Sequence, residues 1–187
     1  MDIFSGRITS SGFSSGDRIV IGDWKDSPFG SFTNIMWAKS DGTRVLISPS
    51  KKLAGYVSSI YSFEEINIAD IEVTREKRGI SVKAGNLEVR MFWGVTFPLP
   101  FWRPKWFIST FEKLIAEKFF NTSTYGITND GRKEWYSIRG ISKVIDAESK
   151  IDGISLGGSV NFEMNACFGF SEPPSWPSSV TLKSYID

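Results

Sequence analysis

Alternating apolar and polar positions predict that most of this chain forms β-strands joined by tight turns. Residues 32–39 and 43–48 are β-forming runs that flank Ser40-Asp41-Gly42, and an Asp-Gly pair between such runs is a strong hairpin signal. The turns at Gly85-Asn86 and Asn129-Asp130-Gly131 separate strands in the same way. Further predicted strands cover residues 18–24, 80–84, 87–93, 125–128 and 132–145.

The longest alternation covers residues 159–170, with Val160, Phe162 and Met164 on one face. A strand of this length suits a strongly curled sheet or a barrel. Residues 63–74 are also extended, but their apolar positions change phase between Ile68 and Ile71, which predicts a β-bulge near residues 69–70. Residues 1–16 indicate a frayed first strand, and residues 180–182 a short edge strand.

Two segments have helical periodicity. Ser48 and Pro49 are typical of a helix start, and the helix is predicted to run to about Tyr61. Pro104 is expected to begin a second helix, because apolar residues then recur at helical spacing to Phe119 while charged residues lie opposite.

The order of these elements is strand hairpins, helix, hairpins, helix, hairpins. This order is typical of an α+β fold, mainly antiparallel β, rather than of alternating strand and helix. We expect a curled sheet or lipocalin-like barrel with two helices. The length of 187 residues predicts a single domain over residues 1–187.

An unusual aromatic segment, residues 91–107, contains seven aromatic side chains and three prolines, Pro98, Pro100 and Pro104. The prolines oppose a helix interior or a central strand. The segment is therefore an apolar connection whose aromatic surface must be covered. Four interpretations remain open: a cover for one end of the core, a ligand-cavity wall, an oligomer interface and a membrane contact.

Composition excludes several function classes. The chain has 22 basic and 21 acidic residues, so no strong field favours nucleic acid as a partner. It contains no histidine and a single cysteine, Cys167, which excludes Ser-His-Asp and Cys-His catalysis and the common zinc sites. We therefore expect no cofactor and no metal.

The same composition bears on location. The N-terminal residues have neither a basic region nor an apolar run, unlike a secretory signal, so we expect a soluble, cytoplasmic protein. The longest uncharged apolar window, residues 91–102, is far shorter than the roughly 20 residues needed for a membrane helix. No integral membrane segment is predicted.

Charged side chains on the predicted strands are the main candidates for chemistry. A carboxylate forced among apolar groups has a raised pKa and can act as an acid or base; the candidates are Asp23, Asp26, Asp70, Glu72 and Glu163. Most strand carboxylates instead point to water or pair with a cation. Arg44 shares a strand face with Leu46, and Arg90 with Phe92, so either is a candidate to bind the carboxylate of an acidic ligand.

Residues 23–68 resemble the corresponding part of a group of uncharacterised actinobacterial proteins of similar length. The points of likeness are Trp24, Ser27-Pro28-Phe29-Gly30, Asp41-Gly42 with Arg44, Pro49, and Tyr61 followed by Phe63. The resemblance covers about a quarter of the chain and implies no activity. It does imply that the loop at residues 27–30 and Arg44 matter in such proteins.

Three hypotheses follow. The preferred one is a β-barrel module that binds an apolar or weakly acidic small molecule in a hydrophobic cavity. The second is a cofactor-independent enzyme that uses carboxylates with Arg or Lys, and the third is a homo-oligomeric structural protein. No catalytic residue is assigned; the predicted ligand-binding residues are Trp24, Phe29, Arg44, Arg90, Phe92, Trp93, Trp102, Phe162 and Met164.

Overall fold

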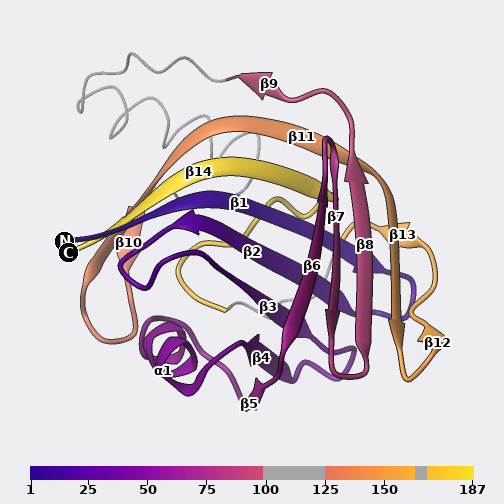
Figure 1. Cartoon of the computed structure of the whole chain (residues 1–187), viewed down its shortest axis with the longest axis horizontal. Coiled ribbons are helices and arrows are strands. Elements are labelled where there is room, and N and C mark those ends of the chain that lie inside the picture. Colours follow the sequence, from indigo (N-terminus) through magenta and orange to yellow (C-terminus); the bar gives the residue numbers. More distant parts are fainter. Residues whose placement is uncertain (99–124, 163–167) are drawn as a thin grey trace.

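The computed structural model describes residues 1–98, 125–162 and 168–187, and these residues are mostly strands (Figure 1). They contain one helix, α1 (Lys51–Ile60). The strands are β1 (Asp2–Phe13), β2 (Arg18–Asp26), β3 (Phe32–Ala38), β4 (Arg44–Ser48), β5 (Glu65–Ile68), β6 (Ile71–Glu76), β7 (Gly79–Ala84), β8 (Leu87–Trp93), β9 (Phe97–Pro98), β10 (Tyr125–Ile127), β11 (Lys133–Ile151), β12 (Ile154–Ser155), β13 (Ser159–Val160) and β14 (Ser178–Ile186).

The strands form one curled sheet with the order β5-β4-β3-β2-β1-β14-β11-β8-β7-β6. Every neighbouring pair along this path is antiparallel except β4 with β5, which is parallel. The first and last long strands lie side by side, with Asp2 opposite Ile186. The two chain ends therefore meet at one edge of the molecule (Figure 1).

Strand β11 belongs to both halves of the sheet. Its residues 134–143 pair with β14, and its residues 144–151 pair with β8. The register shifts between Ile138 and Gly140 and again between Val144 and Asp146. Such bulges bend a strand and increase its twist, so β6, β7 and β8 cross the direction of β1 and β2 (Figure 1).

The two ends of the strand order are consecutive in the sequence. Strands β5 and β6 are separated only by Ala69 and Asp70, and so short a link spans roughly 10 Å at most. The sheet must therefore curl until its two edge strands approach each other. The predicted bulge at residues 69–70 is wrong, because the change of phase marks the passage between two strands at opposite ends of the sheet.

The main hydrophobic core lies between the two halves of the curled sheet. Strands β2, β3 and β4 contribute Ile19, Ile21, Ile35, Val45 and Ile47, and strands β7, β8 and β11 contribute Ile80, Val82, Ala84, Leu87, Val89, Met91, Trp93, Val144 and Ala147. Because successive side chains alternate between faces, residues such as Val20, Gly22 and Trp24 face the other side of the sheet. That second face also needs a cover.

Helix α1 provides part of that cover. The Ser50 side chain accepts a hydrogen bond from the Leu53 backbone N–H at 3.3 Å and caps the helix, which satisfies one of the unpaired donors at a helix start. Leu53, Val57 and Ile60 are buried on its inner side. The helix was predicted from Ser48, but Ser48 ends β4.

The predicted fold class is confirmed at the level of a mostly-strand, curled, antiparallel-dominated sheet. It is a half-barrel rather than a closed lipocalin-like barrel, since no ladder joins β5 to β6 among the described residues. The second predicted helix, residues 104–119, lies outside the described residues.

Three strand predictions differ from the structure. A strand was predicted over residues 159–170, but its described parts contain only the two-residue β13. Phe162 and Phe168, from this segment, instead pack with Val20 and Ala38 on one face of the sheet. Residues 1–16, predicted as a frayed strand, contain β1, and residues 180–182, predicted as an edge strand, belong to β14. Both strands lie in the middle of the sheet.

Replacing Met91, which is fully buried between the two halves of the sheet, with Ala should lower the free energy of unfolding by about 2–5 kcal/mol. The loss combines transfer free energy with a cavity. Ile154→Ala is the control, because Ile154 is 73% exposed and such surface changes stay within about 0.5 kcal/mol. Urea denaturation measures the free energy of unfolding of both variants. Equal losses in the two variants would contradict a core between the two halves of the sheet.

Candidate functional site

A pocket of about 120 Å³ lies on the second face of the sheet, between the strands and α1. Its lining is mostly apolar and comes from β1, β2, β3, β11, β14, α1 and residues 168–174. The lining residues are Phe4, Ile8, Gly22, Trp24, Phe32, Asn34, Met36, Tyr56, Val57, Ile60, Tyr61, Glu134, Tyr136, Ile138, Ile141, Phe168, Ser171, Glu172, Pro173, Pro174, Val180, Leu182, Ser184 and Ile186.

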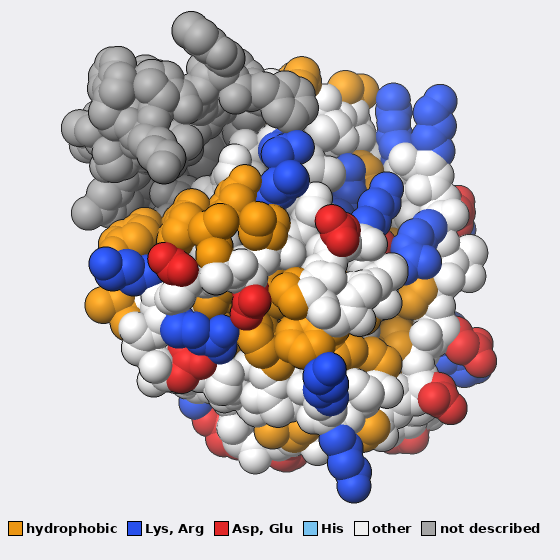
Figure 2. Space-filling model, turned by 60° about the vertical axis from the view of Figure 1, so that its left-hand side comes forward, with side chains coloured by type: hydrophobic (Ala, Val, Ile, Leu, Met, Phe, Trp, Pro, Cys, Tyr) orange, Lys and Arg blue, Asp and Glu red, His pale blue; other side chains and the backbone are white. Residues whose placement is uncertain are grey.

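Strand alternation explains why these residues meet. On β14, Val180, Leu182, Ser184 and Ile186 are two residues apart and share one face, as do Glu134, Tyr136 and Ile138 on β11. Figure 2, which turns the left-hand side of Figure 1 forward, shows hydrophobic side chains gathered among scattered charged ones.

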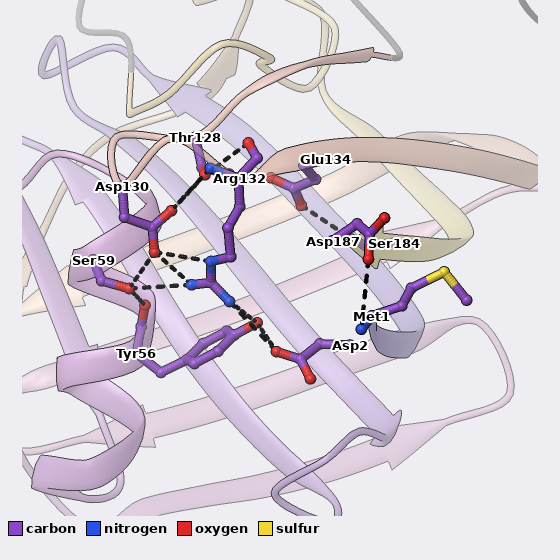
Figure 3. Close-up of polar contacts among 10 residues, drawn as sticks. All are labelled: Met1, Asp2, Tyr56, Ser59, Thr128, Asp130, Arg132, Glu134, Ser184 and Asp187. Carbon is purple, nitrogen blue, oxygen red and sulfur yellow. Dashed lines mark hydrogen bonds and ion pairs between the residues drawn. The ribbon is translucent and has the colours of Figure 1, made fainter.

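The main polar feature of the pocket is the Glu134 cluster, which consists of Glu134, Tyr61, Tyr136 and Ser184. Glu134 is 1% exposed. Its Oε1 accepts hydrogen bonds from Ser184 Oγ at 2.7 Å and from the Tyr61 hydroxyl at 2.9 Å, and the same hydroxyl lies 2.9 Å from Oε2. The Tyr61 and Tyr136 hydroxyls are 2.6 Å apart. The cluster joins β11, β14 and the residue after α1; Figure 3 shows the contact with Ser184.

Burial changes the acidity of this cluster. Desolvation raises the pKa of Glu134, and the hydrogen bonds from Ser184, Tyr61 and Tyr136, together with the charge of Arg132, oppose that rise. Burial also holds the pKa values of Tyr61 and Tyr136 well above their usual range, with Glu134 adding to the effect at Tyr61 and Tyr61 adding to it at Tyr136. Both tyrosines therefore stay protonated and remain donors to the carboxylate.

Near the chain ends, an arginine links α1 to the hairpin of β10 and β11. Arg132 Nη2 donates to Asp130 Oδ2 at 2.6 Å, and Nη1 donates to the Tyr56 hydroxyl at 3.2 Å and to Asp2 Oδ2 at 3.4 Å (Figure 3). Its guanidinium also stacks over the Tyr56 ring at 4.9 Å. Arg132 is thus already engaged by two carboxylates beside the pocket.

A second carboxylate in the lining, Glu172, has a cationic partner. The buried Arg18 forms an ion pair with Glu172 Oε2, while Glu172 Oε1 accepts the Phe168 backbone N–H at 2.6 Å. Glu134, by contrast, has no ion pair with any described residue. Its charged form is stabilised by the hydroxyls of Ser184, Tyr61 and Tyr136, and by the charge of Arg132, which forms no ion pair with it.

Two of the predicted ligand-binding residues lie at or beside the pocket. Trp24 is part of the lining, and its Nε1 donates to Asn34 Oδ1 at 3.3 Å. Phe29 packs against Tyr56 with ring centroids 4.8 Å apart, at the edge of the pocket. Both belong to one cluster with Phe4 and Phe32.

The other predicted residues are not brought to this pocket. Trp93 is buried in the core between the halves of the sheet, and Arg90 is exposed and stacks over Phe92 at 4.5 Å. Arg44 donates from Nε to Glu64 Oε2 at 3.0 Å, and this pairing lowers the pKa of Glu64 to about 2. Phe162 packs against Arg18. Trp102 and Met164 lie outside the described residues, as does most of the aromatic segment 91–107.

The candidate carboxylates are elsewhere too. Asp23 is buried on the core side of the sheet, where it accepts hydrogen bonds from Thr33 at 2.8 Å and from Arg75 Nη2 at 2.7 Å. This pairing with a cation is the common structural use of a strand carboxylate. Asp26, Asp70 and Glu72 are exposed, and Glu163 lies outside the described residues.

Sequence reasoning missed Glu134, Tyr136 and Ser184. A signal for the first two was present, because Glu134, Tyr136 and Ile138 alternate within a predicted strand and therefore share a face. Tyr61 is among the points of the actinobacterial resemblance. Ser184 falls in a tail for which only a short strand was expected.

Among the described residues, no helix is long and apolar enough to cross a membrane. They also contain no group of three or more His, Cys, Asp or Glu side chains placed to hold a metal ion.

Comparison with known proteins gives only a distant structural likeness. No family model matches the chain, and no curated protein matches it. A similar solved structure is the acetoacetate decarboxylase of Legionella pneumophila, with a TM-score of 0.45 and 12% sequence identity, covering 99% of this chain and 84% of that one. The pocket is therefore interpreted from its own geometry.

The stability of the Glu134→Gln variant relative to the unchanged protein should depend on pH. Because the folded-state pKa of Glu134 is raised, the folded protein holds this proton more tightly than the unfolded chain does. The unchanged protein therefore loses stability as pH rises from the ordinary glutamate pKa through the raised value, whereas Gln stays neutral. We expect the variant to gain stability relative to the unchanged protein as the pH rises from 4 to 8.

Thermal and urea unfolding at several pH values measure this difference. Glu88→Gln is the matched control, because Glu88 is exposed and its pKa is lowered by Lys83, so its trend should be flat or opposite in sign. A Glu134→Gln difference that does not change with pH would show that Glu134 is not held in a desolvated site.

Proposed function

We propose that this protein binds a small, largely apolar molecule in the pocket beneath α1. The observation that carries the proposal is a mainly apolar lining around one buried carboxylate that is hydrogen-bonded but has no ion-pair partner among the described residues. Small-molecule sites have this character, since apolar walls provide affinity and a few placed polar groups fix orientation.

The polar end of such a ligand would lie at the Glu134 cluster. Tyr61 and Ser184 hold the carboxylate from two sides, and Tyr136 stacks on Phe170 with ring centroids 5.7 Å apart. These contacts fix the polar groups before a ligand arrives, which lowers the entropic cost of binding.

The described part of the pocket offers little to an acidic ligand. Arg44 and Arg90, the arginines expected to bind a ligand carboxylate, lie outside the lining, and Arg132 and Arg18 are engaged by carboxylates of the protein. We therefore propose an apolar ligand and not a weakly acidic one.

A second candidate function is cofactor-independent catalysis at the same pocket. A buried carboxylate with a raised pKa, joined to two tyrosine hydroxyls, has the character of a general acid or base. Glu134→Gln separates the two functions, because it would abolish turnover of a bound compound while leaving the apolar contacts that retain it.

Native mass spectrometry of freshly purified protein tests the proposal first. We expect a discrete added mass that is lost on denaturation, and extraction followed by small-molecule mass spectrometry would give its class. Ile138→Trp, which places a large ring in the pocket lining, should reduce the amount of bound compound.

A neutral fluorescent probe, Nile red, tests the pocket directly. The unchanged protein should bind it, and Ile138→Trp should weaken binding by about tenfold or more. Ile154→Trp adds the same ring at an exposed position and should bind as the unchanged protein does. If all three proteins bind the probe equally, or none binds it and no compound co-purifies, the pocket is not a ligand site.

A further inference from the structure

If the pocket binds a small molecule, as proposed above, the charges of its lining indicate which chemical class that molecule belongs to. The described lining contains two acidic residues, Glu134 and Glu172, and neither Lys nor Arg. Arg18 neutralises Glu172. Glu134 is therefore the lining carboxylate without an ion pair to a described residue, since Arg132 acts on it only through its charge, and it favours a cation.

We infer that the ligand carries a protonated amine, which binds the Glu134 carboxylate while its hydrocarbon part fills the apolar pocket.

The hydrogen-bond capacity of Glu134 fits this class. A carboxylate has about four acceptor positions, and the hydroxyls of Tyr61, Ser184 and Tyr136 do not fill all of them. An ammonium group supplies further donors together with the missing positive charge. Such charge-assisted hydrogen bonds are about twice as strong as neutral ones.

The aromatic side chains of the lining fit it as well. Trp24, Tyr61, Tyr136 and Phe168 all line the pocket that contains Glu134. Aromatic faces attract alkylammonium groups through their quadrupoles, most strongly where water is excluded. A carboxylate at the end of an aromatic-walled pocket thus provides both attractions that an amine uses.

The same features disfavour the alternatives. An anionic ligand would place a second negative charge beside Glu134, with no described cation of the lining free to offset it. A neutral alcohol would fill the pocket but would gain only an ordinary hydrogen bond. Affinity should therefore fall in the order amine, alcohol, acid.

Three probes with one hydrocarbon part test this order: 4-phenylbutylamine, 4-phenylbutan-1-ol and 5-phenylpentanoate. At pH 7.5 the amine is protonated and the acid ionised. Isothermal titration calorimetry on the unchanged full chain should give binding of the amine at least about tenfold tighter than that of the alcohol, with the acid weakest. The Ile138→Trp variant should weaken all three and so locate the binding.

Glu134→Gln assigns the preference to its residue. It should lower the affinity for the amine to near that for the alcohol, and change the affinity for the alcohol less than about threefold. Glu88→Gln removes a carboxylate from the exposed pair with Lys83 and should leave all affinities unchanged. Should the Gln variant fail to fold, the order of the three probes on the unchanged protein still decides.

The outcomes separate this inference from the proposed function. Equal binding of amine and alcohol, tighter binding of the acid, or an amine preference that persists in Glu134→Gln overturns the amine assignment while leaving a binding pocket. Failure of all three probes, together with failure of Nile red, overturns both.

Discussion

The continuity of β11 is the constraint on which the rest of the structure depends. One strand of 19 residues pairs with β14 along its first half and with β8 along its second. Two register shifts within it turn the sheet, so that a single ladder of strands can fold back over itself. The short link between β5 and β6 completes the constraint, because it ties the far ends of the strand order together. Because of the register shifts in β11 and the short link between β5 and β6, one face of the sheet is enclosed and forms the core. The other face must be covered by segments outside the sheet.

The pocket is a consequence of that division. The core face is filled by aliphatic side chains from both halves of the sheet. Among the described residues, the other face of β1, β2, β3, β14 and the first half of β11 is covered by α1 and residues 168–174. These two segments do not fill the space over the curled sheet, and a pocket remains between them and the strands. The same strand that turns the sheet places Glu134 and Tyr136 in that space, so the curvature and the candidate site share one element.

Local features of this fold were predictable from the sequence, and long-range ones were not. The hairpin at Asp41-Gly42 and the strands before and after Gly85 follow from turn chemistry, which acts over a few residues, and the structure has them as β3 with β4 and β7 with β8. The central positions of β1 and β14 depend on partners nearly the whole chain apart, as the pairing of Asp2 with Ile186 shows. Serine and glycine in β1 lowered its apparent strand propensity, and pairing with two neighbours outweighed it. In the candidate site, Trp24 and Phe29 could be predicted from the sequence as aromatic ligand-binding residues. Glu134 could not, because its role depends on the pairing of β11 with β14 and on the position of Tyr61.

The placement of Glu134 is costly for stability, which is the strongest argument that it has a use. A buried carboxylate loses hydration worth several kcal/mol unless a cation repays it, and Asp23 shows that this chain does pair a buried strand carboxylate with arginine. At Glu134 the described surroundings supply hydroxyl groups instead. Those donors hold the carboxylate in place and reduce the cost of its burial, yet the described residues give it no ion-pair partner. A structural role would be served by Gln, whose amide oxygen can accept from Ser184 and Tyr61 as Glu134 Oε1 does, without the charge. A ligand cation needs the charge itself, and an ion pair with it would offset the cost of burying the Glu134 carboxylate.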